Sequence, residues 1–136
     1  MTANLTTQPA TRSRALARPA SITRWVLQVF LAVQFASGGV LKLIGDASMV
    51  DLFTDVGVGQ WLRYVVGVCE LAGAIGLLVP RLSAVAALGL TGLMAGAVAT
   101  NVLIGISPAM PAVFLLIAGV IAYGRRAQLR RPSHTR

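Results

Sequence analysis

The feature that most constrains this chain is the run of residues 83–104, which carries no charged side chain. A helix needs about 20 predominantly apolar residues to cross a hydrocarbon core of roughly 30 Å, and this run is long enough. Three further apolar runs of similar length lie at residues 22–44, 61–79 and 106–124. The sequence therefore predicts an all-α membrane protein, folded as a four-transmembrane-helix bundle with the lipid bilayer as its surroundings.

The charge content agrees with a membrane location and excludes nucleic acid as a partner. Apolar residues make up 56% of the chain and charged residues only 12%, whereas charged residues approach about a quarter of a soluble domain. The formal net charge of +8 would suit a phosphate backbone if it formed one basic stripe. Most of the basic residues instead flank the apolar body at both ends: Arg12, Arg14, Arg18, Arg24, Arg125, Arg126, Arg130, Arg131 and Arg136.

The same basic residues predict the orientation of the chain. Segments on the cytoplasmic side hold the excess of Lys and Arg, and here both ends and the turn at residues 80–82 are basic. Residues 45–60 contain three aspartates and no Lys or Arg, which is typical of the outer side. We therefore expect a multi-pass protein of the inner (plasma) membrane with both termini cytoplasmic. On one side of the outer segment, Met49, Leu52, Phe53 and Val56 would form an apolar face.

The composition also divides the chain into three parts. Residues 1–20 are polar and Arg-rich and are expected to be a disordered basic N-terminal tail. A transit peptide has a similar bias, but no small-residue cleavage site precedes the long apolar run that follows. Residues 21–124 form the four-helix transmembrane domain, and residues 125–136 form a basic C-terminal tail.

The chain has few side chains that could bind a metal ion or a redox cofactor. Cys69 is the only cysteine, so neither an internal disulfide nor a thiolate metal cage can form within one chain. The single histidine, His134, lies in the polar C-terminal tail. We therefore expect no intrinsic metal or cofactor.

The most informative residue is Glu70, which interrupts the second apolar run. A carboxylate at bilayer depth costs on the order of 3 kcal/mol, so it is expected to have a partner. If Trp61 marks the outer boundary, Glu70 lies about 13 Å below it; if Trp25 marks the inner boundary, Lys42 lies about 5 Å below the outer surface. Side chains tilt toward the N-terminus of their helix, so on antiparallel helices Lys42 and Glu70 lean toward each other.

Other polar side chains extend this hypothesis to a ligand site. Arg63 stands seven residues before Glu70 and so shares its helix face, while Asn101 falls near the outer end of the third span and Gln34 near the middle of the first. We expect a polar cavity that opens outward, with Lys42, Glu70, Arg63, Asn101 and Gln34 as its ligand-binding residues. The alternative is that these residues only join the helices, at about 0.6 kcal/mol each.

Glycine is dense in the spans, and Gly92 and Gly96 have the GxxxG spacing of closely packed transmembrane helices. We interpret it as tight packing within the bundle, with a homo-oligomer as the alternative.

Two segments resemble the DoxX family of small bacterial membrane proteins. They are "SGGVLKL", Ser37 to Leu43, at the end of the first span and "GVCELAGAIGLL", Gly67 to Leu78, in the second. The resemblance covers about Trp25 to Gly124 and implies four spans, with Lys42 and Glu70 at the recurrent charged positions of the family. It also implies a link to membrane redox complexes. In that setting the chain would seat a quinone or dock a redox protein partner, with Lys42 or Arg63 donating to quinone carbonyls and Glu70 exchanging a proton.

Three functions are therefore open, and whether the chain is an enzyme is left undecided. The first is an accessory subunit of a quinone-linked redox system. The second is a small proton-coupled transporter, because an intramembrane carboxylate can carry a proton. The third is a structural or assembly protein of the membrane that binds no ligand.

Overall fold

The computed structural model describes residues 10–130, and the side chains of residues 21–130. It contains helices α1 (Ala10–Ile44), α2 (Ala47–Val56), α3 (Gln60–Leu78), α4 (Ser83–Leu103), α5 (Ala109–Gly124) and α6 (Arg126–Leu129). Within these described residues there is no strand. The predicted all-α fold is confirmed.

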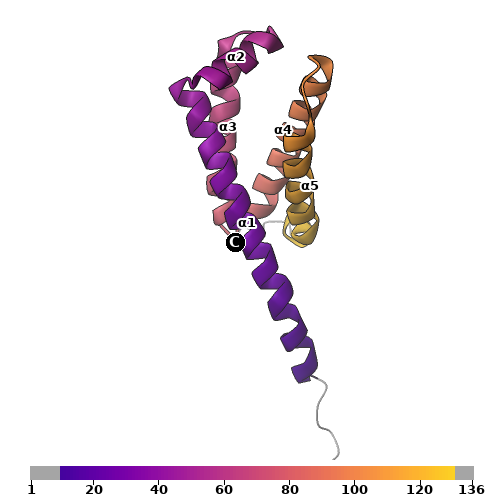
Figure 1. The fold of residues 1–136 in the computed structure, drawn as a ribbon. Helices are drawn as coiled ribbons and strands as arrows, with labels where there is room; N and C mark the ends of the chain where they lie inside the picture. The colour runs from indigo at the N-terminus through magenta and orange to yellow at the C-terminus, as the bar shows by residue number, and fades with distance from the viewer. Residues whose placement is uncertain (1–9, 131–136) are drawn as a thin grey trace, which may run out of the picture.

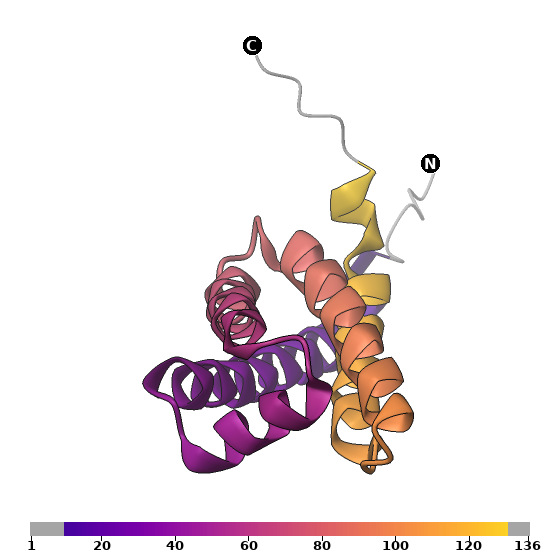
Figure 2. The same cartoon turned by 90° about the horizontal axis from the view of Figure 1, so that it is seen from above.

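The long helices form two antiparallel pairs. Helix α1 packs along α3, and α4 packs along α5, while α3 and α4 join the pairs through the link at residues 79–82 (Figure 1). Seen from above, the α1–α3 pair lies beside the α4–α5 pair, and α2 lies at the upper end against α3 and α1 (Figure 2). Helix α6 lies at the opposite end, so the described residues nearest to both termini share one end of the bundle (Figure 1).

Three of the helices have the length and composition needed to cross a membrane: Ser21–Ile44, Gln60–Leu78 and Ser83–Leu103. Helix α5 is apolar but has only 16 residues, or about 24 Å of helix. The prediction of a helix over 106–124 was therefore too long at its beginning. The physical reason is Pro108, because a residue that precedes proline is disfavoured in the helical conformation, and Gly105 already turns the chain with φ +74°. Pro111 falls in the first turn of α5, where a proline is tolerated.

Helix also extends into both of the expected tails. Helix α1 begins at Ala10, so it includes residues 10–20 of the predicted N-terminal tail. Alanine, leucine and arginine are strong helix formers. The helix of the following span can also extend into this stretch without the cost of nucleating a new helix. In the C-terminal tail, α6 forms one turn after Arg125. The remaining tail residues, 1–9 and 131–136, lie outside the described residues.

Helix α2 has the apolar face that its sequence predicts. Phe53 is buried, and Met49, Leu52 and Val56 are half-buried, whereas the aspartates of the helix are exposed. At its N-terminus Asp46 accepts a hydrogen bond from the backbone N–H of Ser48, and at its C-terminus Gly57 takes a left-handed conformation with φ 76°. Helix α2 is thus a short amphipathic helix that packs on α3.

The core lies where the two pairs meet. Its fully buried large side chains come from all four long helices: Leu31, Leu77, Leu90 and Ile121. The rings of Phe35 on α1 and Phe114 on α5 lie with their centroids 5.8 Å apart. On the outside the helices are also apolar, with Leu116 and Val120 of α5 exposed at 70% and 61%. An apolar surface of this extent suits surrounding lipid.

Candidate functional site

The site begins with a close contact between the backbones of α1 and α3. A Cβ atom added at Gly39 would lie 2.8 Å from the carbonyl oxygen of Gly67 and 2.9 Å from Cγ of Leu71. A Cβ atom added at Gly67 would lie 3.1 Å from both the carbonyl oxygen of Gly39 and Cβ of Lys42. Glycine is needed at both positions for the helices to approach this closely.

This contact brings an ion pair together between the two helices. The Nζ atom of Lys42 donates to Oε2 of Glu70 at 2.9 Å, and the two side chains are 13% and 6% exposed. Gly38 leaves room beside them, because a Cβ atom there would lie 3.3 Å from Oε2 of Glu70. The prediction that these two side chains lean toward each other is confirmed in geometry.

Arg63 is buried next to the pair and holds the end of α1. The residue is 4% exposed, its Nε donates to Oε1 of Gln60 at 2.8 Å, and its Nη1 donates to the carbonyl oxygen of Lys42. That carbonyl belongs to the last turn of α1, where carbonyl groups lack a partner within the helix. The guanidinium also lies over the ring of Tyr64, with Cζ 4.3 Å from the centroid.

The cluster of Lys42, Arg63 and Glu70 has an excess of positive charge. It contains two cations and a single carboxylate, and among the described residues that carboxylate forms its ion pair with Lys42. An ammonium group has three N–H donors, and the described residues accept one from Lys42. The arrangement can therefore donate hydrogen bonds to an electron-rich oxygen atom while a carboxylate lies within reach of the same atom.

Two of the five predicted site residues lie elsewhere. Gln34 is exposed on α1, and Asn101 on α4 donates its Nδ2 to the carbonyl oxygen of Ser107 at 3.1 Å. Asn101 thus fixes the link between α4 and α5, and in the described part of the chain no hydrogen bond joins it to the cluster. Among residues 21–130, no group of three His, Cys, Asp or Glu side chains could hold a metal ion.

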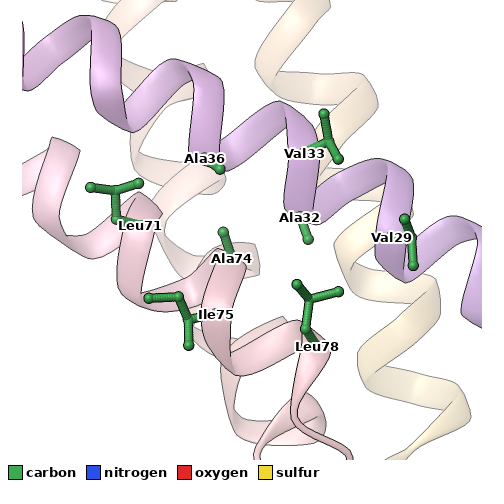
Figure 3. Close-up of a pocket in the computed structure, with 8 residues that line it drawn as sticks. All are labelled: Val29, Ala32, Val33, Ala36, Leu71, Ala74, Ile75 and Leu78. Carbon is green, nitrogen blue, oxygen red and sulfur yellow. The ribbon is translucent and has the colours of Figure 1, made fainter.

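A hollow near the cluster is apolar rather than polar. It is a groove of about 170 Å³ between α1 and α3, where Ala32 and Ala74 point into the space between the helices (Figure 3). Ala74 is one helical turn from Glu70, so the groove lies next to the charge cluster along α3. None of the residues that line the groove is charged, so the cluster itself is not part of it.

One buried polar residue was missed in the sequence. Gln28 is fully buried on α1, where its Nε2 donates to the carbonyl oxygen of Leu77 at 2.7 Å and its Oε1 accepts from Nε and Nη2 of Arg125 at 3.0 and 2.6 Å. It joins α1 to the end of α3 and to the residue after α5. The sequence shows Gln28 only as one of two glutamines in the first apolar run, without indicating which of them is buried.

Comparison with known proteins supports the resemblance noted in the sequence. Residues 26–122 match the DoxX-like family, a range that runs from the first long helix to α5 and includes the whole charge cluster. Among curated proteins and among solved structures, none matches significantly. Because the match extends over most of the chain, this protein belongs to the DoxX-like family.

Proposed function

We propose that this membrane protein is an accessory subunit of a quinone-linked redox system and that the cluster of Lys42, Arg63 and Glu70 binds the quinone headgroup. The observation that carries the proposal is the ion pair at 2.9 Å, buried between two helices that are apolar enough to cross a membrane. Charged residues inside a membrane span are costly, and they commonly mark ligand or proton pathways.

The chemistry of a quinone fits the donors of the cluster. Its two carbonyl oxygens accept hydrogen bonds and gain negative charge on reduction, which the excess positive charge of the cluster would stabilise. Lys42 has spare N–H donors for this purpose, and Glu70 would supply or accept a proton as the quinone changes its redox state. The electrons would come from a redox protein partner in the membrane.

The proposed setting of the site follows from the charge distribution. With the basic ends of the chain in the cytoplasm, the cluster would lie in the outer half of the inner (plasma) membrane. The quinone would then enter from the bilayer, where quinones reside because of their apolar tails.

The proposal is tested by quinone titration of the purified full chain in lipid nanodiscs. The variants are Glu70→Gln, Lys42→Met and, as a matched control for loss of one acid, Asp55→Asn on the exposed face of α2. The probe is a short-chain ubiquinone, followed through quenching of the fluorescence of the two tryptophans. We expect saturable binding to the wild type and to Asp55→Asn, and a loss of at least tenfold in affinity for the other two variants, or about 1.4 kcal/mol.

The same preparations separate the competing functions. Wild-type chains that show no saturable binding, or Glu70→Gln chains that bind like the wild type, would overturn the quinone site. Proton-coupled uptake that depends on Glu70 in proteoliposomes would instead indicate a transporter. A change in thermal stability alone would indicate a structural or assembly protein.

A further inference from the structure

At the α6 end of the bundle, two arginines lie close together, and among the described residues neither forms an ion pair with an acidic side chain. Arg24 of α1 packs against the end of α5. A Cβ atom added at Gly124 would lie 3.6 Å from Nε of Arg24. Arg125 follows directly after Gly124, and its Cζ lies 6.0 Å from the centroid of the Trp25 ring. The four acidic residues of the sequence lie in or next to α2 or, in the case of Glu70, in the ion pair with Lys42.

Arg125 is held in place by a neutral group rather than by a carboxylate. Two of its N–H groups donate to the buried amide oxygen of Gln28, and a guanidinium has five N–H donors. Burial, and then the positive charge of Arg24, hold the pKa of the Arg125 guanidinium below its ordinary value. The two half-buried guanidiniums therefore leave positive charge and N–H donors that no carboxylate of the described residues neutralises.

An apolar track starts beside these arginines. A hollow of about 430 Å³ is lined by Trp25, Val26, Val29 and Phe30, and Val29 also lines the groove between α1 and α3 (Figure 3). Along α1 the two hollows extend from Trp25 to Ala36, or about 16 Å. That length is about half of a hydrocarbon core of roughly 30 Å, which is the depth of one leaflet.

We propose that this end of the bundle binds an anionic phospholipid, with the headgroup phosphate on Arg24 and Arg125 and one acyl chain in the track from Trp25 to Ala36. Guanidiniums form strong, paired hydrogen bonds with phosphate oxygens, and basic pockets between transmembrane helices are known to take anionic headgroups. Trp25 lines the start of the track next to Arg125, and tryptophan prefers the boundary between headgroups and chains.

The test is native mass spectrometry of the purified full chain in detergent with equal amounts of phosphatidylglycerol and phosphatidylcholine. The variants are Arg24→Gln, which leaves the Gln28–Arg125 contact intact, and Val29→Trp, which fills the track. Arg81→Gln is the control, because Arg81 is an exposed arginine in the α3–α4 link at the same end of the bundle. A parallel sample contains inorganic phosphate as a competitor.

We expect the wild type and Arg81→Gln to retain phosphatidylglycerol at least tenfold over phosphatidylcholine, and each of the other two variants to lose most of that preference. Equal retention of both lipids by the wild type would overturn the site. Equal losses in Arg24→Gln and Arg81→Gln would show diffuse charge attraction instead. Displacement of the lipid by inorganic phosphate would indicate a free anion site, and unchanged binding by Val29→Trp would exclude the chain from the track.

Discussion

A charged side chain within the hydrocarbon region is stable only when its surroundings replace the lost water. Glu70 is 6% exposed, and it receives a hydrogen bond from Lys42 across the contact between Gly39 and Gly67. Removal of one partner leaves the other charge buried without compensation, which is far more costly than removal of both. Lys42 and Glu70 therefore each depend on the other for their stability between the helices.

The pairing could be predicted from the sequence, whereas the roles of the glutamines could not. The rise per residue gives the depth of each side chain along its helix, and the direction of the Cα–Cβ bond gives its tilt. These two quantities are enough to predict that Lys42 and Glu70 lie close together. Gln28 and Gln34 are six residues apart, so they point in directions about 120° apart around α1. Both the lipid face and the core face of this span are apolar, so no pattern in the sequence shows which glutamine points inward.

Outside the membrane spans, the cap of α2 makes a prediction about pH. The hydrogen bond from the Ser48 side chain to Asp46 lowers the pKa of Asp46 from its ordinary 3.8. The ionised Asp46 cap therefore contributes fully to the stability of α2 above about pH 4. This contribution is lost as the pH falls through the lowered pKa of Asp46. We expect the backbone amide of Ser48 to lose protection from hydrogen exchange below that pKa.

The control is Asp46→Asn, because asparagine is as good a helix cap but does not titrate. The amide of Ser48 in this variant should keep the same protection across the acid range. Protection in the wild type that is independent of acid pH would contradict the role of Asp46.

At the scale of elements, the fold depends on how closely two helices approach. The α1–α3 contact excludes any side chain larger than hydrogen at Gly39, since its Cβ atom would meet the backbone oxygen of Gly67. The "SGGVLKL" and "GVCELAGAIGLL" segments are the two sides of this contact. Element ends were harder to predict: Pro108 delayed the start of α5, and α1 extended to Ala10.

The glycine contact predicts a difference between two conservative variants. Gly39→Ala should destabilise the bundle by about 1–3 kcal/mol, because backbone atoms cannot yield as a flexible side chain can. Gly92→Ala should instead leave the unfolding free energy unchanged or raise it by up to about 1 kcal/mol, since a Cβ atom at Gly92 meets nothing within 4 Å and alanine is the better helix former. Reversible unfolding in mixed micelles, followed by tryptophan fluorescence, measures both values. Equal costs for the two variants would contradict the close contact of α1 and α3.

At the scale of the whole molecule, two antiparallel pairs place both described ends of the chain on one side (Figure 1). In a membrane, both ends lie on the same side if α5 crosses the bilayer together with the three longer helices. At about 24 Å it is shorter than the average hydrocarbon core, and a short span is accommodated by local thinning of the bilayer. Composition and span length were enough to predict the class of fold, because the bilayer sets the length of the elements that cross it.

Thiol labelling in intact cells tests the crossing of α5 and the orientation together. With Cys69 replaced by serine, a cysteine introduced for Asp51 should react with a membrane-impermeant reagent added outside. Cysteines introduced for Arg81 and for Ala127 should react only after the cells are opened. Labelling of Ala127→Cys from the outside, with Arg81→Cys protected, would show that α5 does not cross.

The claim that Lys42 and Glu70 stabilise each other inside the membrane can be tested by a double-mutant cycle. The unfolding free energies of the wild type, Lys42→Met, Glu70→Gln and the double variant are measured in bicelles. A second cycle pairs Lys42→Met with Asp51→Asn, which removes an exposed acid. We predict a favourable coupling of at least about 1 kcal/mol for Lys42 with Glu70 and none for Lys42 with Asp51. Additive costs for Lys42 and Glu70, within about 0.5 kcal/mol, would contradict the claim.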